Sequence, residues 1–476
     1  MKESKIYIRV DGGPEIGLGH LVRCMALAHM LKDDFEINFV SKEIPDNISE
    51  DILNQGFLVK RIDSEQDIFS YLSGKEIVVV DHYGLDSAYQ ENIKRRGSKL
   101  ICIDDLHNKL FYADLIINHA PGITPEDYKA QTYTQFALGL DYALLRPEFL
   151  KAAKQKKINK EVNTVFVCFG GSDLKNITER CLNVLLGMDK FERIIVVVGS
   201  SHQKVRQIKE IAAGNKEVDF YHSIDAKKML ELMKISDLAI VPSSGILLEA
   251  LSLGLKIISG MYVENQRYVF ENYNKEGVFV SAGNFSKEDI LLAVNKLISQ
   301  SSAPLVDIDG HSALRINKYF QRIMIEDDVV LRTAGKEDLE ITFQWANNSV
   351  VRAHSFTRGE IELIDHSEWF MNKLNNSGCY YLIAQLDKKV IGSIRFDINN
   401  DEAVINFLVD PQFHRQGFGI IILKKGLENL KSRYSYLKYV IGYVMKDNIA
   451  SIKAFQRLGY NIFSEDGNYK FIKELN

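Results

Sequence analysis

The stretch RVDGGPEIGLGH, residues 9–20, combines glycines with one histidine in a way that suits anion binding and base catalysis. Gly17 and Gly19 permit positive φ angles and let a ligand approach the backbone closely, and the helix predicted to follow offers free N–H groups to an anion. His20 falls in the first turn of that helix. The helix dipole disfavours imidazolium there, so we expect a neutral imidazole that can act as a general base. A histidine that only packs the turn would fit the spacing equally well. The stretch is not the dinucleotide-binding fingerprint, which requires glycine where Val22 stands.

Two further groups of polar residues follow predicted strands in the first third of the chain. The segment DHYG begins at Asp81, directly after one strand, and Asp104 and Asp105 follow the next. Residues just beyond the carboxyl ends of parallel strands line the crevice in which α/β sheets bind ligands. We therefore expect both groups to meet the glycine-rich turn, with Asp11 and Tyr83 among the substrate-binding residues. Each group alone would also suit an ordinary polar loop.

The middle third repeats the arrangement of strand, small-residue loop and helix. The segment GGSD, residues 170–173, suits phosphate oxygens at a helix N-terminus. The segment PSSGILLE, residues 242–249, has the same form, and its glutamate could accept hydrogen bonds from ribose hydroxyls or only balance the helix dipole. The segment ENQ, residues 264–266, begins a further predicted helix. The residues predicted here to bind the substrate are Gly170, Gly171, Ser244, Gly245, Glu249 and Asn265.

The segment LVDPQFHRQGFG, residues 408–419, has the pattern of a pyrophosphate-binding turn between a strand and a helix. Successive N–H groups at the start of such a helix wrap the pyrophosphate, glycines let the backbone approach it, and an arginine adds positive charge. A second segment, NIASIKAFQRLGY at 448–460, follows at the expected distance, so a chance pair of glycines explains the pattern poorly. The predicted cofactor-binding residues are Val409, Arg415, Gln416, Gly417, Phe418, Gly419 and Asn448.

The elements that must position these residues differ along the chain. Apolar runs rich in Ile and Val alternate with helical patterns over the first two thirds, as is typical of parallel strands buried on both faces in an α/β architecture. The strands expected first are Lys5–Val10, Glu36–Val40, Ile77–Val80, Lys99–Ile103 and Leu115–Ile117, with a helix at Leu21–Leu31. A second series comprises Thr164–Phe169, Arg193–Val198, Val218–Tyr221, Leu238–Val241, Lys256–Ile258 and Val278–Val280, closed by a helix near Ser312–Ile323.

In the last third, predicted strands follow one another through short turns. They are Val329–Thr333, Tyr380–Leu386, Lys389–Ile398, Glu402–Val409 and Tyr439–Val444, with helices after Gly419 and at Ala450–Leu458. Such turns, with Asn399-Asn400-Asp401 as the strongest, indicate antiparallel hairpins. The lysine-rich stretch Lys151–Glu161 is interpreted as a linker, although the end of a solvated helix would fit it too. We predict three domains, at 1–155, 156–325 and 329–476.

Composition restricts the class of protein. The 476 residues carry 59 basic and 63 acidic side chains, a net charge of -4, which argues against nucleic acid as the main partner. Five scattered cysteines form no CxxC pair, so neither a disulfide framework nor a thiolate zinc site is supported, and a cytoplasmic location fits best. We expect no signal peptide and no membrane span. No residue pattern demands a metal.

The first two thirds resemble the UDP-sugar hydrolases of pseudaminic acid biosynthesis, which remove UDP from UDP-2,4-diacetamido-2,4,6-trideoxy-β-L-altropyranose. The matching segments are IGLGHLVRCMALA at 16–28, VDHYGLD at 80–86, IDDL at 103–106, GLDYALLRPEF at 139–149, FGGSD at 169–173 and Ser243–Glu249. The resemblance implies a two-lobed GT-B fold with two Rossmann-like halves, similar to MurG-type glycosyltransferases. It further implies that His20 activates water at the anomeric carbon, and that the second lobe holds uridine and diphosphate around Gly170, Ser244, Gly245 and Glu249. Gly12-Gly13-Pro14 departs from the small polar residues usual in the family, which bears on substrate selection.

Residues 329–476 resemble the GNAT acetyltransferases, an α+β family that uses acetyl-CoA and a splayed pair of central strands. The segment Arg352–Leu374 is similar to the branch that acetylates the 4-amine of UDP-4-amino-4,6-dideoxy-N-acetyl-β-L-altrosamine. Phe356 and Trp369 in this segment could pack on a nucleotide or sugar, or could belong to the core.

The acetyltransferase pattern is incomplete at its proton-transfer positions. Asn406 stands where many members have a glutamate, and Phe455 stands where many have a tyrosine acid. Tyr443 or Tyr460 could substitute for that acid, or water could serve. Asn448 fits a cofactor-positioning role.

Both resemblances point to consecutive steps of one pathway. We therefore expect a bifunctional enzyme whose C-terminal domain acetylates a UDP-amino sugar with acetyl-CoA, and whose N-terminal domain then releases UDP without a metal. The partners expected are UDP-amino sugars, not nucleic acid or membranes. Two alternatives stay open: a UDP-sugar glycosyltransferase fused to a GNAT domain for another amine, such as a protein N-terminus, and a half that only binds ligand.

Overall fold

The chain folds into two compact units, Met1–Tyr319 and Phe320–Asn476. The computed structural model describes residues 4–13, 17–155, 161–171, 173, 175–188, 190–200, 202–261, 267–299, 307–357, 359–465 and 467–475. The two α/β halves expected in the first two thirds lie together in the first unit, and the division falls inside helix α11 (Ser312–Ile325). The predicted domain boundaries stay predictions. The expected linker begins inside helix α4 (Pro147–Ala152), and its residues 156–160 lie outside the described residues.

A parallel sheet of order β3-β2-β1-β4-β5-β7-β9 forms the first lobe of the first unit. Its strands are β1 (Lys5–Val10), β2 (Glu36–Ser41), β3 (Leu58–Arg61), β4 (Ile77–Asp81), β5 (Lys99–Ile103), β7 (Leu115–Asn118) and β9 (Gln135–Leu138). The chain leaves β1 toward one edge and returns to β4 toward the other. The carboxyl ends of β1 and β4 therefore form a topological switch point, the place where open α/β sheets bind ligands.

A second parallel sheet, of order β12-β11-β10-β13-β14-β15, forms the other lobe. Its strands are β10 (Thr164–Cys168), β11 (Arg193–Val198), β12 (Val218–His222), β13 (Leu238–Pro242), β14 (Lys256–Gly260) and β15 (Val280–Ser281). Its switch point lies at the carboxyl ends of β10 and β13. A two-stranded sheet pairs β6 (Leu110–Phe111) with β8 (Lys129–Ala130).

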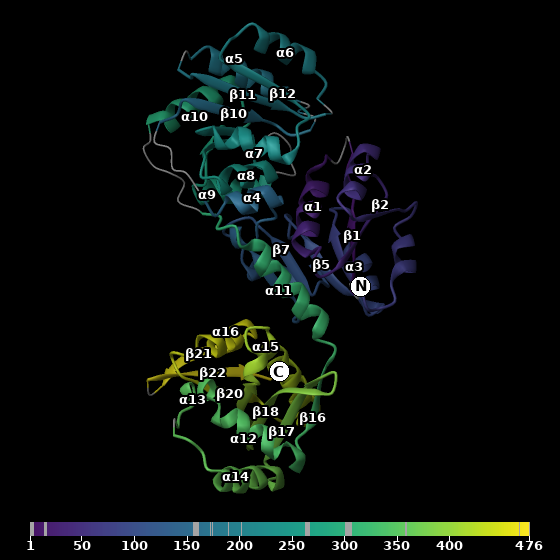
Figure 1. Ribbon diagram of the computed structural model, residues 1–476, viewed down its shortest axis with the longest axis vertical. Coiled ribbons are helices and arrows are strands. Elements are labelled where there is room, and N and C mark those ends of the chain that lie inside the picture. Colours follow the sequence, from purple (N-terminus) through teal and green to yellow (C-terminus); the bar gives the residue numbers. More distant parts are fainter. Residues whose placement is uncertain are drawn as a thin grey trace. The chain divides into compact units, whose positions relative to one another are not determined.

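Helices cover both parallel sheets, as the doubly wound connections require (Figure 1). Besides α4 and α11, they are α1 (Gly19–Leu31), α2 (Asp46–Asn54), α3 (Ser87–Arg95), α5 (Ile177–Leu186), α6 (Val205–Ala213), α7 (Ala226–Lys234), α8 (Gly245–Ser252), α9 (Arg267–Lys275) and α10 (Lys287–Ser299). Strands such as β4 and β13 are buried along their whole length, which explains their continuous apolar sequences. The short edge strands β3 and β9 are less buried and were not predicted.

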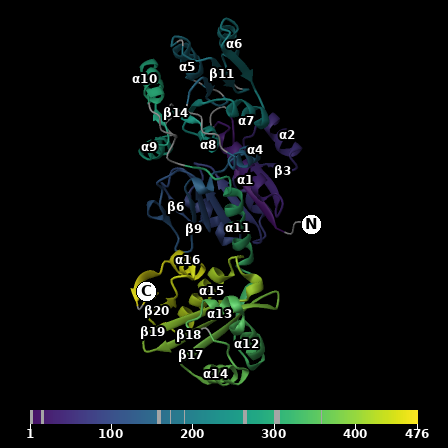
Figure 2. The same ribbon diagram turned by 60° about the vertical axis from the view of Figure 1, so that its left-hand side comes forward.

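The second unit is built on a mixed sheet of order β16-β17-β18-β19-β20-β22-β21. Its strands are β16 (Val329–Thr333), β17 (Cys379–Leu386), β18 (Lys389–Asn399), β19 (Glu402–Val409), β20 (Tyr439–Val444), β21 (Asn461–Glu465) and β22 (Asn468–Glu474). Its helices are α12 (Leu339–Asn347), α13 (Ser349–Ala353), α14 (Leu363–Asn375), α15 (Phe418–Arg433) and α16 (Ile449–Arg457). Residues of α15 and α16 join the main core on one face, and α14 packs on the other (Figures 1 and 2).

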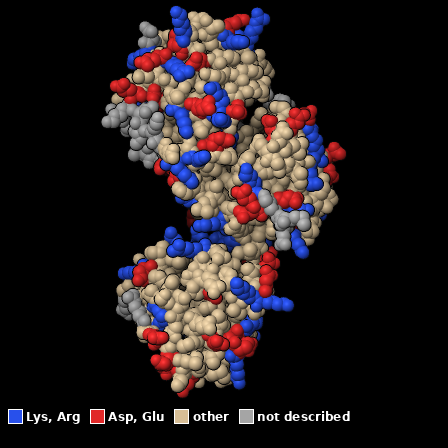
Figure 3. Space-filling model, viewed as in Figure 1, with Lys and Arg blue, Asp and Glu red and all other residues tan. Residues whose placement is uncertain are grey.

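The predicted α/β halves followed by an α+β domain are confirmed by these three sheets. On the face shown in Figure 3, acidic and basic side chains are interspersed over the surface. In the described part of the chain, no helix is both long enough and apolar enough to cross a membrane.

Candidate active sites

His20 forms a buried pair with Asp81 at the switch point of the first sheet. Its Nδ1 lies 2.6 Å from Asp81 Oδ1, and Asp81 is the last residue of β4. Because an ionised carboxylate only accepts hydrogen bonds, the proton on the imidazole belongs on Nδ1. Among the described residues, Nε2 has no hydrogen-bond partner. A histidine held in this way presents Nε2 as a proton acceptor.

Three neighbouring side chains close a ring with this pair. Arg23, one turn further along α1, donates to both oxygens of Asp81 at 2.6 Å and to Asp105 Oδ2 at 2.6 Å. Tyr83 donates its hydroxyl to the same Asp105 oxygen at 2.9 Å. The aromatic ring of Tyr83 lies edge-on to the imidazole of His20, with centroids 4.6 Å apart, so the series of contacts returns to His20.

The charges of this ring determine its protonation. Burial alone would raise the pKa of Asp81, but Arg23 and His20 hold it below its ordinary value. Arg23 lowers the pKa of Asp105 against the same opposing effect of burial. Burial raises the pKa of the Tyr83 hydroxyl, and the negative charge of Asp105 adds to the increase. With both carboxylates ionised, the arginine protonated and the tyrosine neutral, the ring carries a charge of about -1 when His20 is neutral.

Asp11 holds the glycine-rich turn in place. Its carboxylate accepts from Arg9 at 2.6 and 2.8 Å, and from the backbone N–H groups of Lys42 and Glu43. Arg9 is fully buried and also binds Glu65. The structure thus gives Asp11 structural partners, and its predicted contact with substrate stays a prediction.

The glycines of the turn shape its backbone. Gly17 adopts φ +82°, and a Cβ at either Gly17 or Gly19 would meet nothing within 4 Å. These two positions therefore leave space beside the backbone, and their predicted contact with substrate stays a prediction. A Cβ at Gly12, by contrast, would lie 2.2 Å from a methyl of buried Leu21. Pro14 lies outside the described residues.

In the second lobe, Gly170 and Gly171 follow β10 at the switch point, as predicted, but they do not open a helix. Helix α5 begins only at Ile177, and its first N–H groups are bound by the Asp173 carboxylate at 2.9 and 2.7 Å. The prediction that these glycines open a helix is therefore wrong, because Asp173 binds the first N–H groups of α5, and the phosphate site predicted around the glycines stays a prediction. The two glycines can still offer backbone N–H groups, since Gly170 adopts φ +77° and has nothing within 4 Å of a Cβ.

Ser244 and Gly245 lie exposed at the start of α8, and the side chain of Ser244, its N-cap residue, makes no capping hydrogen bond within the described part of the chain. Glu249, on the same helix, is 5% exposed, and both its oxygens accept from Arg146 at 2.6 and 2.8 Å. Each oxygen keeps a second lone pair that can accept a hydrogen bond, and the predicted contact with ribose stays a prediction. Asn265 lies outside the described residues.

The glycine turns of the two lobes approach one another. A Cβ at Gly171 would lie 3.8 Å from Leu18 Cδ1, which stands two residues before His20. The segment that carries the imidazole therefore lies close to the loop after β10. This arrangement can place an anionic group of a ligand beside the Nε2 atom of a histidine base.

The second unit carries the predicted pyrophosphate turn between β19 and α15. Asp410 anchors it by accepting from Trp345 Nε1 at 2.9 Å and from the Gln412 N–H at 2.8 Å. Arg415 adopts φ +64° and Gly417 φ +90°, so the backbone bends into a left-handed turn directly before α15. Such a turn exposes successive N–H groups to an anion.

The predicted side chains of this turn point in different directions. Arg415 and Gln416 are exposed, whereas Phe418 is buried in the core, so only its backbone can contact a cofactor. Asn448 caps α16 by accepting from the Ser451 N–H at 3.1 Å. Val409 and Gly419 lie on either side of the turn, with a Cβ at Gly419 3.6 Å from a Val409 methyl.

Strands β19 and β20 part next to this turn. They pair only from Glu402 with Tyr439 to Ile405 with Gly442. Phe455 packs where they diverge, its ring 5.8 Å from that of Phe407 and too close to Gly442 to allow a Cβ there. The opening offers unpaired backbone groups of both strands to an extended ligand.

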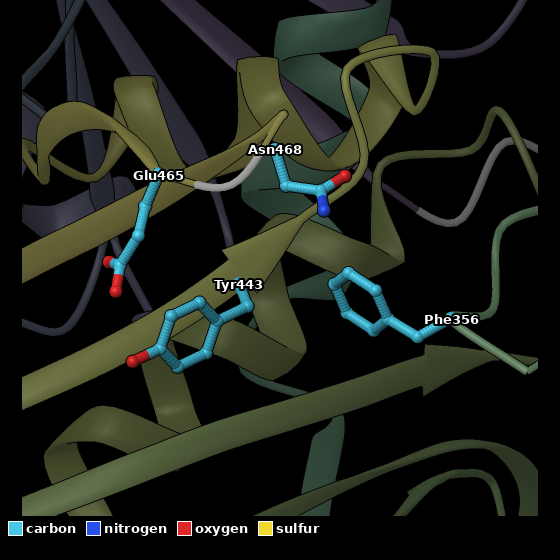
Figure 4. A pocket seen from close by; sticks show the side chains of 4 residues that line it. All are labelled: Phe356, Tyr443, Glu465 and Asn468. Carbon is cyan, nitrogen blue, oxygen red and sulfur yellow. The ribbon is translucent and has the colours of Figure 1, made fainter.

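A cavity of about 350 Å³ lies near the open end of β20, lined by Phe356, Tyr443, Glu465 and Asn468 (Figure 4). Phe356 and Tyr443 are 62% and 42% exposed, so neither belongs to the core. Glu465 pairs with Lys470 at 3.3 Å. The cavity therefore combines two aromatic faces with a hydroxyl and a carboxylate, a set that suits a polar ligand.

The other residues of the second unit that the sequence singled out differ in how deeply they are buried. Tyr460 is buried against Phe455, and its hydroxyl has no hydrogen-bond partner in the described part of the chain. Trp369 lies at the surface, with the Arg395 guanidinium 4.9 Å from its ring. Asn406 is exposed on β19. Of the two tyrosines proposed from the sequence, only Tyr443 lines the cavity.

Sequence reasoning missed Arg23 and Arg146. Arg23 stands in the middle of a helical pattern, and Arg146 precedes a short helix 103 residues from its partner Glu249. For Arg23 the available signal was its spacing of three residues from His20, which places both side chains on one face of α1. No pattern in the sequence around Arg146 indicated that it would bind Glu249.

Two family models match the chain. Residues 328–461 match the acetyltransferase (GNAT) domain, and residues 186–307 match glycosyl transferases group 1. The protein thus joins a glycosyltransferase-like domain of GT-B type to a C-terminal GNAT domain, which confirms the predicted fold class.

Relatives match the whole chain and each part of it. An uncharacterized protein of Methanocaldococcus jannaschii is 26% identical over 99% of this chain and 100% of its own length. The UDP-2,4-diacetamido-2,4,6-trideoxy-beta-L-altropyranose hydrolase of Campylobacter jejuni is 26% identical over 55% of this chain and 93% of its own. The acetyltransferase PseH of the same organism is 29% identical over 29% of this chain and 85% of its own. The similarity to the Methanocaldococcus jannaschii protein therefore spans both units of this chain.

Proposed function

We propose that this protein catalyses two consecutive steps on a UDP-amino sugar. The second unit transfers an acetyl group from acetyl-CoA to the 4-amine of UDP-4-amino-4,6-dideoxy-N-acetyl-β-L-altrosamine. The first unit hydrolyses the product, UDP-2,4-diacetamido-2,4,6-trideoxy-β-L-altropyranose, to UDP and the free sugar. The observation that carries the proposal is the buried His20–Asp81 pair with Nε2 unpartnered among the described residues. The similarity of the two parts to a hydrolase of this substrate and to an acetyltransferase supports it.

Hydrolysis requires water to form a bond to the anomeric carbon while the bond from that carbon to the UDP oxygen breaks. His20 Nε2 takes the proton of the water, and Asp81 stabilises the imidazolium that results, as carboxylates do beside histidine bases. UDP leaves with the electron pair of the broken bond. Because UDP is a good leaving group, no strong acid is needed, and backbone dipoles on the diphosphate supply the remaining stabilisation.

The second lobe provides the groups that hold the diphosphate and nucleoside. The exposed start of α8 at Ser244 and Gly245 offers N–H groups and a positive dipole end to a phosphate. Gly170 and Gly171 add backbone N–H groups from the neighbouring loop. Glu249, fixed by Arg146, accepts from a ribose hydroxyl through its remaining lone pairs.

In the second unit, the turn before α15 binds the acetyl-CoA pyrophosphate and the opening beside β19 admits the pantetheine arm. The amine nitrogen attacks the thioester carbonyl, the carbon–sulfur bond breaks, and CoA leaves as thiolate. The cavity with Phe356 and Tyr443 receives part of the acceptor. With Asn406 and Phe455 unable to transfer protons, Tyr443 or water carries the proton between amine and thiolate.

A variant of each site separates the two proposed activities. His20→Ala should lower the rate of UDP release by about 10²- to 10⁴-fold and leave acetyl transfer intact. Gly417→Asp should impair acetyl transfer and leave UDP release intact. A substitution that removed both activities from a folded protein would contradict two separate sites. The readouts are UDP by chromatography and CoA thiol by colorimetry.

A glycosyltransferase is the second candidate, favoured by the match of residues 186–307 to glycosyl transferases group 1. The same histidine would then deprotonate an acceptor hydroxyl instead of water. Release of the free sugar in a reaction without any acceptor would support hydrolysis. UDP formation that depends on an added acceptor would support transfer.

A further inference from the structure

Arg23 and Asp105 are both bound into the ring that holds His20, and Arg23 Nη2 also lies 3.2 Å from His20 Nδ1. Arg23 uses Nε and Nη2 for Asp81 and Nη1 for Asp105, so a single guanidinium joins two carboxylates from the ends of β4 and β5. Asp105 in turn holds the hydroxyl of Tyr83, whose ring packs against the imidazole. The side chain of Arg23 is 13% exposed and that of Asp105 is 6% exposed. Water therefore screens these contacts only weakly.

We propose that Arg23 and Asp105 are positioning residues for UDP release: through Asp81 and Tyr83 they fix the imidazole of His20 and balance the charge around it. This inference rests on the proposed hydrolysis. It goes further because it assigns a function to two side chains that the proposed hydrolysis does not use as acid, base or nucleophile. The ring carries a charge of about -1 with neutral His20 and about zero once the imidazole has taken a proton. Neutralising the ring favours the imidazolium that the reaction creates.

Because Arg23 and Asp105 carry opposite charges, removing one or the other should change the pKa of the base in opposite directions. Removing the positive charge of Arg23 leaves two carboxylates near His20, which stabilises the imidazolium and raises the pKa of the base. Removing the negative charge of Asp105 leaves Arg23 partly unbalanced beside the imidazole, which lowers that pKa. A residue that merely supports the fold would change the amount of active enzyme and leave the pKa of its base unaltered.

Other titratable groups around the ring come from α1 itself and from four neighbouring elements. They are Cys24 on α1, Asp104 at the end of β5, His119 after β7, Tyr128 before β8 and Tyr273 on α9. Burial lowers the pKa of His119 to about 4 and raises the pKa of Cys24, Tyr128 and Tyr273. Burial also raises the pKa of Asp104. His82, next to Asp81 in the chain, faces Asp11 at 3.3 Å.

The test is the pH profile of kcat/KM for UDP release from UDP-2,4-diacetamido-2,4,6-trideoxy-β-L-altropyranose, whose acid limb reports the base of the free enzyme. In the full-length protein, Arg23→Gln should move this limb to higher pH by about one unit, and Asp105→Asn should move it to lower pH. Arg23→Lys keeps the positive charge, but an ammonium group lacks the planar guanidinium that bonds to Asp81 and Asp105 at once. It should leave the limb within a few tenths of a unit and lower kcat about tenfold.

His82→Gln is the matched control, because it removes a second histidine at the end of the same strand and should not move the limb. Circular dichroism and thermal unfolding give the folded fraction by which each rate is divided. If Arg23→Gln does not fold, Asp105→Asn alone decides the direction.

Acid limbs that stay in place, or that move in the same direction in both variants, overturn the assignment. A wild-type enzyme that releases no UDP from this substrate at any pH overturns the proposed function, and the inference with it. The two failures are distinguishable, because only the second is seen in the wild type.

Discussion

At the scale of single residues, His20 has one ring nitrogen engaged and one available. Asp81 accepts from Nδ1, and Arg23 binds both oxygens of that carboxylate. Asp81 thus orients the imidazole of His20, and Arg23 in turn orients the carboxylate of Asp81. His20 can act as a base only in the tautomer that carries its proton on Nδ1. That tautomer is favoured because Asp81 is ionised and accepts the Nδ1 hydrogen bond.

Replacing His20 by alanine should lower the rate of UDP release by about 10²- to 10⁴-fold, the usual contribution of a general base. The protein should still fold, because Asp81 keeps both of its hydrogen bonds from Arg23. The measurement is the initial rate of UDP formation, with the unfolding midpoint as control. Retention of more than a tenth of the wild-type rate would contradict the role of His20 as the base.

Asp81→Asn tests the tautomer itself. An amide can donate a hydrogen bond to Nδ1, which would place the imidazole proton on Nε2 and prevent it from accepting the proton of water. We expect kcat to fall by about 10²-fold or more while KM stays near its wild-type value. A fall in kcat/KM caused only by KM would instead indicate that Asp81 supports substrate binding.

Residue types and spacing predicted part of this arrangement. His20 could be singled out because glycines, a strand end and a helix start surround it within twelve residues. Asp81 was identified only as a strand-end residue, because its partnership with His20 spans 61 positions. Arg23 looked like any arginine on a helix. Its role depends on which two carboxylates the sheet brings beside it, and strand order cannot be read from a local pattern.

At the scale of elements, close backbone contacts hold the loops that carry the second-lobe site. A Cβ at Gly199, after β11, would lie 2.5 Å from Gly171 Cα and 2.7 Å from Gly170 O. Because these are backbone atoms, the loop after β10 would have to move. Sequence predicted the loop and its glycines, but placed a helix directly after them. The helix starts later because Asp173 caps it.

Gly199→Ala should therefore raise KM for UDP release about tenfold and lower the free energy of unfolding by about 1–3 kcal/mol. Gly214→Ala in the same lobe is the control, since its Cβ would meet only ordinary contacts of 3.5 Å or more. Steady-state kinetics and urea unfolding of both variants provide the comparison. Equal KM values for the two would show that the loop after β10 does not hold the substrate.

In the second unit, two substitutions at Gly417, in the turn before α15, distinguish the effect of backbone strain from the effect of a negative charge on cofactor binding. Gly417 adopts φ +90°, so any side chain strains the backbone there, and an aspartate also repels a pyrophosphate. We expect Gly417→Ala to weaken acetyl-CoA binding moderately and Gly417→Asp to weaken it at least tenfold more. Calorimetric titration with CoA measures both. Equal affinities for the two variants would exclude pyrophosphate from this turn.

The turn before α15 was predicted nearly residue by residue, because its pattern is contiguous. The cavity beside Tyr443 was not, since its lining comes from the segment after α13, from β20 and from the hairpin of β21 and β22. Strand β21 is exposed along its length, and it lacks the apolar alternation that reveals a strand.

At the scale of the whole molecule, the two compact units carry one proposed site each, in the reverse of their proposed order of action. If the sites act independently, neither needs to be on the same chain as the other. An equimolar mixture of His20→Ala and Gly417→Asp proteins should then convert the amino sugar completely to UDP and free diacetamido sugar. A mixture that stops at the acetylated UDP-sugar, although each single variant keeps its expected activity, would indicate transfer of the intermediate within one chain.

The most direct test of the central claim is a mass-spectrometric time course with UDP-4-amino-4,6-dideoxy-N-acetyl-β-L-altrosamine, in the presence and absence of acetyl-CoA. With acetyl-CoA, an acetylated UDP-sugar should appear first, followed by UDP and the free diacetamido sugar. Without acetyl-CoA, no acetylated sugar should form. Failure to form either product, in a protein that binds acetyl-CoA, would contradict the proposed substrate and direct attention to other UDP-amino sugars.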